Sequence, residues 1–167
     1  MLRPVVIALC LTIPTIGFTH KSFKPGPLEG VWKITEVTTT GANPATISNP
    51  QPSLVIFTKG HYSFTSVNSE GPRPTFAAAK DPKKLTDAEK MARYEQWSPF
   101  SANAGSYDVK GTTLTRRPLV AKNETVMAKN FSIESEFKLD GNTLSLTTKS
   151  MPGQPAGEMR QQLRRVE

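Results

Sequence analysis

The chain contains 167 residues, of which 37% are hydrophobic and 21% are charged. This length and composition fit a single soluble globular domain and exclude a polytopic membrane protein. The single cysteine, Cys10, excludes a disulfide scaffold, a zinc site built from cysteines and a cysteine nucleophile. Fourteen prolines divide the chain into short segments, which argues against a helical bundle.

The net charge is +7, and its distribution along the chain bears on possible partners. The 21 lysines and arginines are interleaved with 14 acidic residues from one end of the sequence to the other. They form no long run of like charges and no basic motif with interleaved aromatics. The excess of positive charge therefore indicates a basic, solvated surface, and we expect no nucleic-acid partner.

The amino terminus has the features of an export signal. Arg3 supplies a positive charge, and the apolar run Val5–Ile13 has the length of a signal-peptide core, whereas a transmembrane helix needs about 20 apolar residues. Pro14 follows this run, and Thr15-Ile16-Gly17 places small residues at the positions that a signal peptidase reads. We therefore predict a signal peptide over residues 1–17 and a periplasmic or extracellular location.

A short connection separates this signal from the folded part of the chain. Residues 18–27 are polar and rich in proline and glycine, which predicts a flexible tether before a domain over residues 28–167. The site after Gly17 differs from the A-x-A pattern of signal peptidase, so an uncleaved membrane anchor is the alternative. Once the signal is removed, we expect no stable membrane insertion.

The first part of the domain predicts three strands. Val31–Thr39 is rich in β-branched residues, which favours a strand. Thr40–Pro52 contains one glycine and three prolines, which predicts a loop. The next two strands flank a Lys59-Gly60 turn and predict a β-hairpin: Ser53–Thr58 and His61–Val67.

The middle of the chain predicts a loop, one helix and a second hairpin. Asn68–Pro82 is rich in proline, serine and glycine, which is typical of a loop. Thr86 and Glu89 have the spacing of a capping box at the start of a helix that ends before Pro99. Two strands around a Lys-Gly turn form the second hairpin: Gly105–Val109 and Thr112–Arg116. Pro118–Asn130 is either a loop or a short helical turn.

The last third of the chain alternates apolar and polar residues most regularly. Phe131–Leu139 and Thr143–Thr148 form a hairpin around Asp140-Gly141-Asn142, and Glu158–Val166 is the final strand. The total is eight strands joined mostly as hairpins. We therefore predict an all-β fold, an eight-stranded up-and-down antiparallel barrel with one helix inserted between strands 3 and 4. Such a barrel either fills with side chains or holds one small ligand.

Several short motifs occur in an order that is found in a known family. They are G-x-W in Leu28–Trp32, Lys59-Gly60-His61, Gly71–Pro74, Gly105–Val109, the hairpin Phe137–Leu146 and the terminal Arg165-Val166. In these motifs the chain, from Leu28 to Val166, resembles the bacterial lipocalin-like domain family, whose fold is a calycin-type β-barrel. The resemblance implies a closed barrel with an internal cavity. It implies no single activity, because barrels of this type include binding proteins and enzymes.

The same resemblance assigns a structural role to three residues. In lipocalins the tryptophan of G-x-W closes the barrel floor beneath an arginine of the last strand, with a cation–π contact between them. By resemblance, Gly30 and Trp32 belong to this floor. Arg165 is the matching arginine, and Arg164 is the second candidate.

Motifs that would indicate catalysis or a cofactor are absent from the sequence. The two histidines, His20 and His61, lie in the predicted tether and beside a turn, so neither suggests a metal site. There is no G-x-S-x-G elbow and no phosphate-binding glycine loop. Glu134 and Glu136 alternate with apolar residues and should face solvent. We therefore predict no catalytic residue, no metal and no cofactor.

Aromatic residues provide the candidate binding site. Five occupy the predicted inward positions of strands, and Trp97 ends the predicted helix; the cavity-lining candidates are Tyr62, Phe64, Trp97, Tyr107, Phe131 and Phe137. In this hypothesis the two tyrosine hydroxyls orient a ligand. The alternative is that the aromatics fill the barrel as a solid core.

Together these features predict an exported protein that binds an apolar or amphipathic small molecule, as a monomer or weak dimer. One alternative is a barrel enzyme, such as an isomerase or cyclase acting on a hydrophobic substrate. That chemistry needs a buried acid or base, and the candidates are Tyr62, Tyr107, Arg116 and Glu36. The other alternative is a packed, ligand-free barrel that acts as an envelope or interaction protein.

Overall fold

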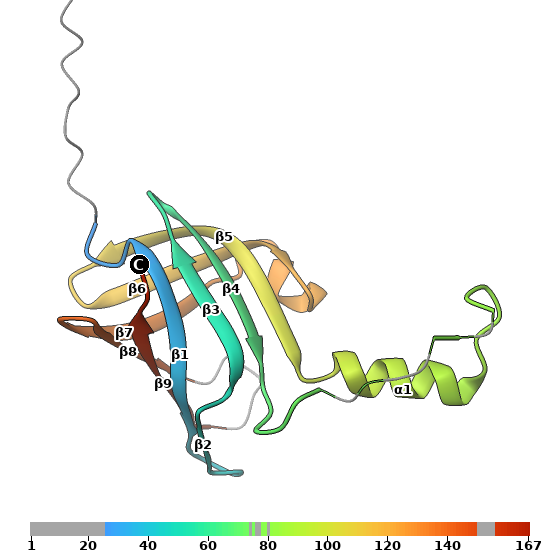
Figure 1. Ribbon diagram of the computed structural model, residues 1–167. Helices are drawn as coiled ribbons and strands as arrows, with labels where there is room; N and C mark the ends of the chain where they lie inside the picture. The colour runs from blue at the N-terminus through green and yellow to red at the C-terminus, as the bar shows by residue number, and fades with distance from the viewer. Residues whose placement is uncertain (1–25, 74, 76–77, 80, 150–155) are drawn as a thin grey trace, which may run out of the picture.

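The computed structural model describes residues 26–73, 75, 78–79, 81–149 and 156–167. The predicted signal peptide and most of the predicted tether lie outside these residues. In chain order the elements are β1 (Gly30–Thr39), β2 (Ala45–Ser48), β3 (Gln51–Phe57), β4 (His61–Val67), α1 (Asp87–Trp97), β5 (Phe100–Lys110), β6 (Thr113–Ala121), the 3-10 helix η1 (Glu124–Met127), β7 (Ile133–Asp140), β8 (Thr143–Lys149) and β9 (Glu158–Arg165) (Figure 1). None of the helices in the described part combines the length and hydrophobicity needed to cross a bilayer.

The strands form one antiparallel sheet that closes on itself. Its order is β2-β1-β3-β4-β5-β6-β7-β8-β9, and β1 also pairs with β9, from Trp32 opposite Arg165 to Thr39 opposite Met159. Eight strands therefore make a closed up-and-down barrel. Strand β2 pairs only with the C-terminal part of β1, from Glu36 to Thr39. This is the all-β, eight-stranded up-and-down antiparallel barrel expected from the sequence.

The predicted position of the helix in the order of strands is wrong. Helix α1 lies between β4 and β5 and not between strands 3 and 4. The count changes because Ala45–Ser48, inside the predicted loop Thr40–Pro52, pairs with the end of β1 and forms the additional strand β2. The prolines around this segment favour a loop, but β2 is an edge strand with a single neighbour, where prolines nearby cost no ladder hydrogen bonds.

Two further boundaries differ from the sequence-based prediction. Strand β6 continues through Pro118 to Ala121, because the register shifts by one residue of β6 between Gly105, opposite Pro118, and Ala104, opposite Val120, which lets the ladder pass the proline. A side chain at Gly105 would place its Cβ 2.0 Å from the carbonyl oxygen of Arg117, so this close approach requires glycine. After β6 the chain makes the short helix η1, and Phe131 precedes β7 instead of starting it.

The core occupies one end of the barrel. Its fully buried side chains come from five strands and from the segment before β1: Leu28, Trp32, Ile34, Val55, Phe57, Leu114, Leu144, Leu146 and Leu163. The indole of Trp32 donates to the carbonyl of Leu28 over 2.8 Å. The guanidinium carbon of Arg165 lies 4.1 Å from the centroid of the Trp32 ring. These contacts close this end, which we call the floor.

Gly30 is part of the same closure. Its φ is 132°, and a Cβ at this position would lie 2.4 Å from the carbonyl oxygen of Glu167 and 2.5 Å from Nη1 of Arg165. A side chain would therefore push the last strand away from Trp32. The G-x-W pattern has a direct physical reason here, because only glycine leaves room for the arginine above the indole.

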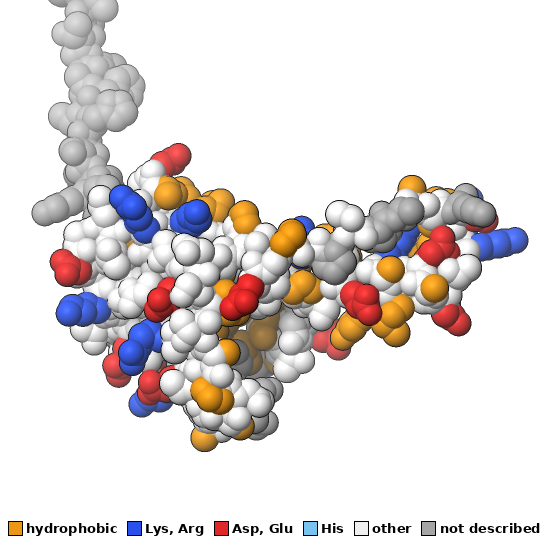
Figure 2. All heavy atoms as spheres, turned by 60° about the horizontal axis from the view of Figure 1, so that its bottom comes forward, with side chains coloured by type: hydrophobic (Ala, Val, Ile, Leu, Met, Phe, Trp, Pro, Cys, Tyr) orange, Lys and Arg blue, Asp and Glu red, His pale blue; other side chains and the backbone are white. Residues whose placement is uncertain are grey.

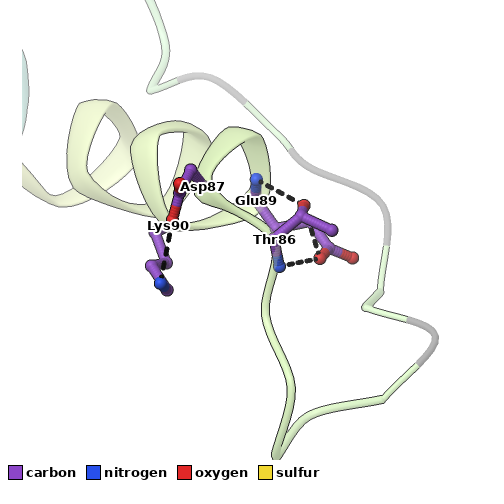
Figure 3. Close-up of polar contacts among 4 residues, drawn as sticks. All are labelled: Thr86, Asp87, Glu89 and Lys90. Atoms are coloured by element: carbon purple, nitrogen blue, oxygen red, sulfur yellow. Dashed lines mark hydrogen bonds and ion pairs between the residues drawn. The ribbon is translucent and has the colours of Figure 1, made fainter.

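Helix α1 extends away from the barrel (Figure 1), and none of its residues is buried. At its start the Thr86 hydroxyl accepts from the Glu89 amide, while a Glu89 carboxylate oxygen accepts from the Thr86 amide at 2.8 Å, which is the predicted capping box (Figure 3). At its end the Lys122 ammonium donates to the carbonyls of Trp97, Ser98 and Phe100. Local capping and this one lysine therefore define the helix, with little help from packing.

Candidate functional site

The inner wall of the barrel changes from apolar to polar with distance from the floor. Beyond the fully buried leucines, six buried polar side chains point inward, from β3, β4, β6, β7, β8 and β9: Ser53, Ser66, Arg116, Ser135, Thr148 and Gln161. Each occupies an inward position of its strand, because buried and more exposed residues alternate there. We call this group the polar layer. It is the candidate functional site.

Arg116 is the charged member of this layer. It follows the core residue Leu114 by two positions in β6, so the alternation of the strand points it inward, and its exposed fraction is 3%. Its guanidinium carbon lies 5.7 Å from the ring centroid of Tyr62 and 6.0 Å from that of Phe64. Nη2 donates to the Ser135 hydroxyl over a long 3.4 Å.

The bonding of Arg116 is incomplete. Its Nε is buried and has no hydrogen-bond partner. The ion pairs found in the described part of the chain, Lys90 with Asp87 and Arg117 with Asp108, do not involve it. The interior charge is thus held by one long hydrogen bond and two aromatic faces, without a carboxylate among the described residues.

Burial and mutual interaction shift the pKa values of Arg116 and Tyr62. Desolvation lowers the pKa of Arg116, and the nearby Tyr62 opposes this by raising it. Desolvation raises the pKa of Tyr62, and the positive charge of Arg116 lowers it. The Tyr62 hydroxyl is therefore protonated at neutral pH and donates to Oδ1 of Asn103 at 2.7 Å.

The remaining polar side chains continue the layer around the wall. The hydroxyls of Ser135 and Thr148 lie 2.6 Å apart, across the β7–β8 ladder. The register of β8 and β9 places Gln161 diagonally across from Thr148, and Oε1 of Gln161 is buried without a hydrogen-bond partner. The layer therefore contains two unpartnered polar atoms, one on Arg116 and one on Gln161.

The six cavity-lining candidates occupy different parts of the molecule. Tyr62 and Phe64 are buried beside Arg116. Tyr107 and Phe137 are half-buried and pack against the core near the floor. The Tyr107 ring meets Phe57 edge-on at 5.1 Å, and its hydroxyl donates to the carbonyl of Thr58 at 3.0 Å. Tyr62 and Phe64 thus adjoin the polar layer, whereas Tyr107 and Phe137 adjoin the apolar core.

Phe131 and Trp97 lie at outer surfaces. Phe131 borders a groove of about 680 Å³ that is lined mainly by outward residues of β7–β9, among them Glu134, Glu136 and Lys149. Trp97 is 51% exposed and borders an apolar groove of about 390 Å³ over β4, β5 and β6. Arg73 lies 5.4 Å from the centroids of both the Trp97 and Phe100 rings.

The four acid–base candidates of the enzyme hypothesis do not form one group. Tyr62 and Arg116 adjoin each other, but Tyr107 reaches toward the turn between β3 and β4. Glu36 pairs with Gln162, whereas the neighbouring Val37 pairs with the buried Gln161, so Glu36 is on the outer face of the barrel. In the described residues, no three His, Cys, Asp or Glu side chains are grouped so that they could hold a metal ion.

Sequence reasoning named Arg116 only as an acid–base candidate and did not identify Ser135, Thr148 or Gln161. The available signal was the strand parity: Arg116 shares the face of Leu114, and Gln161 shares that of Leu163. Polar residues at inward positions are informative because charged side chains are seldom fully buried without a partner. Two residues of the binding-site prediction, Tyr62 and Phe64, adjoin the layer that this parity marks.

Comparison with known proteins adds the following. No protein-family model matches the sequence, and no curated protein matches it. Among solved structures, the chain is similar to a lipocalin-like protein from Bacteroides uniformis, with 13% sequence identity and a TM-score of 0.46. The similarity covers 84% of this chain and 100% of that protein.

Proposed function

We propose that this protein is an exported binding protein that holds an apolar or amphipathic small molecule inside its barrel, at the end opposite the floor. The observation that carries this proposal is the polar layer beyond the floor, in which Nε of Arg116 and Oε1 of Gln161 are buried without a hydrogen-bond partner. Trp32, Val55 and Leu163 are 0% exposed, whereas Phe64 and Ile133 at the other end are 8% exposed. Phe64 and Ile133 thus lie closer to solvent than the fully buried side chains of the floor, toward the mouth of the barrel, where ligands bind in small β-barrels.

The surface at that end supports the same direction of entry. Figure 2 views the molecule from the end opposite the floor, and it shows a hollow beside the base of α1 with apolar side chains inside it. The floor itself offers no route, because the indole of Trp32 and the guanidinium of Arg165 cover it. A ligand would then contact Tyr62 and Phe64 before it reached the leucines of the core.

The test is binding of an uncharged apolar fluorophore, N-phenyl-1-naphthylamine. We expect one site per chain with micromolar affinity, about −8 kcal/mol. Thr148→Phe fills the inner wall and should weaken binding at least tenfold. Thr147→Phe is the matched control, because this neighbouring threonine belongs to the outer face and pairs with Glu136. Unfolding midpoints establish that both variants are folded.

Two results would contradict the proposal. If the wild-type protein binds no fluorophore, the barrel is packed solid and the ligand-free alternative is correct. If Thr148→Phe and Thr147→Phe weaken binding equally, the fluorophore occupies an outer groove and not the barrel interior.

Export rests on residues 1–17 and has its own test. Expression of the full chain in a bacterium should yield periplasmic or extracellular protein that begins near Phe18. Mass spectrometry of the intact secreted protein measures this directly. Membrane-bound protein that retains Met1 would favour the uncleaved anchor instead.

A further inference from the structure

Arg116 places a full positive charge inside the barrel. Moving an ion from water into a protein interior costs several kcal/mol after relaxation, unless partners compensate it. Arginine cannot avoid this cost by losing its proton, as lysine can, because it stays charged in proteins. The 3% exposed guanidinium must therefore be stabilised by what surrounds it.

The described surroundings supply only part of that stabilisation. An arginine side chain has five N–H donors. In Arg116, Nη2 donates to the Ser135 hydroxyl at 3.4 Å, whereas Nε is buried without a hydrogen-bond partner. The rings of Tyr62 and Phe64, at 5.7 and 6.0 Å, lie near the outer limit of a cation–π contact. Donors thus remain available to a group that enters the barrel.

The adjacent arginine in the same strand has the carboxylate partner that Arg116 lacks. Arg117 points to the outer face and forms an ion pair with Asp108 of β5, although solvent already stabilises its charge there. Arg116 has the greater need for a counterion and finds none in the described part of the chain. The distribution of charge is therefore opposite to what stability alone would favour.

We infer that Arg116 binds the carboxylate of the ligand, which makes the ligand an amphipathic carboxylic acid, and this inference rests on the binding function proposed above. The planar guanidinium forms two parallel hydrogen bonds with a carboxylate, a geometry that lysine cannot provide. A monocarboxylate also balances the single charge of Arg116. The lowered pKa of this arginine is consistent with a site that lacks its anion.

Other members of the polar layer complete the site. Gln161 has a buried amide whose Oε1 lacks a partner, and rotation of the amide by half a turn would present N–H donors instead. The Tyr62 hydroxyl beside the guanidinium has one O–H, which donates to Asn103, and it becomes a second neutral donor for the ligand only if it releases that bond. These groups stabilise a carboxylate without adding a second positive charge.

The packing of the barrel orients the ligand. Leu114, Leu144 and Leu163 on the floor side are 0% exposed, so that side has no room for an alkyl chain. The carboxylate therefore lies deepest, at Arg116, and the apolar tail extends toward the open end along Phe64 and Ile133. This head-inward orientation follows from the floor being closed.

The experiment compares two ligands with the same chain and different heads. Dodecanoate and dodecan-1-ol are each titrated, below their aggregation limits and at pH 8, against protein that holds the uncharged fluorophore used above. We expect dodecanoate to displace the fluorophore at a concentration at least ten times lower than dodecan-1-ol does. The preference of the wild-type protein for the acid is the quantity that reports the head group.

Two adjacent variants assign that preference to one side chain. Arg116→Met should abolish the preference, because methionine fills a similar volume without charge, and dodecan-1-ol binding is measured in the same variant as the reference. Arg117→Met is the control and should retain the full preference, since its side chain points outward. If Arg116→Met fails to fold, Arg116→Lys keeps the charge but loses the planar fork, and it should lower the preference.

Each outcome decides between the two proposals. Equal displacement by acid and alcohol in the wild-type protein would overturn the carboxylate inference and leave the binding function standing. An undiminished preference in Arg116→Met, or in Arg116→Lys if that variant replaces it, would also overturn the role of Arg116. If neither the fluorophore nor either ligand binds, the binding function fails, and the inference fails with it.

Discussion

The two ends of the barrel each contain an arginine beside aromatic rings, but the two arginines are bonded differently. Arg165 is half-buried, lies 4.1 Å from the Trp32 centroid and donates to the carbonyls of Glu29 and Pro27. Arg116 is buried deeper, lies farther from its rings and has an unpartnered Nε. The bonds of Arg165 join the last strand to the segment before β1. The one long hydrogen bond of Arg116 joins only the two neighbouring strands β6 and β7.

This difference separates a structural arginine from a candidate binding one. Arg165 stabilises the fold because its partners are main-chain carbonyls that are present whenever the chain is folded. Arg116 costs stability in the absence of a ligand, because desolvation of its charge is not matched by hydrogen bonds. A protein retains such a residue at the expense of stability, as binding sites commonly do.

The largest change in the free energy of unfolding is expected from a substitution at the floor. Arg165→Ala should lower the free energy of unfolding by about 1–2 kcal/mol, because it removes a cation–π contact and the packing of the side-chain stem. Arg116→Met should leave it unchanged or raise it, because it removes a poorly compensated buried charge. Denaturant midpoints of the two variants measure both. A larger loss for Arg116→Met than for Arg165→Ala would reverse the assignment of roles.

A smaller effect should appear at high pH, through Tyr62 and Tyr107. Burial raises the pKa of both above the usual value near 10. Their contribution to stability is therefore complete below pH 10 and is lost as the pH rises through the higher pKa of the folded state. Tyr62→Phe should reduce the loss of stability between pH 9 and pH 11, as denaturant midpoints will measure. Tyr94→Phe, on the exposed face of α1, is the control.

The same titration links Tyr62 to Arg116. The positive charge of Arg116 lowers the pKa of Tyr62, so Arg116→Met should shift the ionisation of this tyrosine to higher pH. Absorbance of the tyrosinate at 295 nm follows the shift in the folded protein. An unchanged titration curve would mean that the two groups do not interact as their geometry indicates.

Local patterns in the sequence determined the elements of this fold. Alternation around Lys59-Gly60 and around Asp140-Gly141 predicted two hairpins, because a tight turn and its flanking strands depend on neighbouring residues. Thr86 and Glu89 predicted the start of α1 for the same reason. The short strand β2 and the passage of β6 through Pro118 were missed, since pairing to β1 and a register shift between β5 and β6 decide them.

The candidate site, too, was predictable from the sequence only in part. Strand parity in the sequence already places Arg116 on the face of Leu114, and alternation is a local property. Only the closed barrel decides which groups surround that face, because Tyr62, Ser135 and Gln161 come from strands far apart in the chain. Whether a buried charge has a partner depends on every strand that faces it. The local sequence therefore determines most of the secondary-structure elements of this protein, whereas the unmet hydrogen-bonding capacity of Arg116 arises only in the assembled barrel.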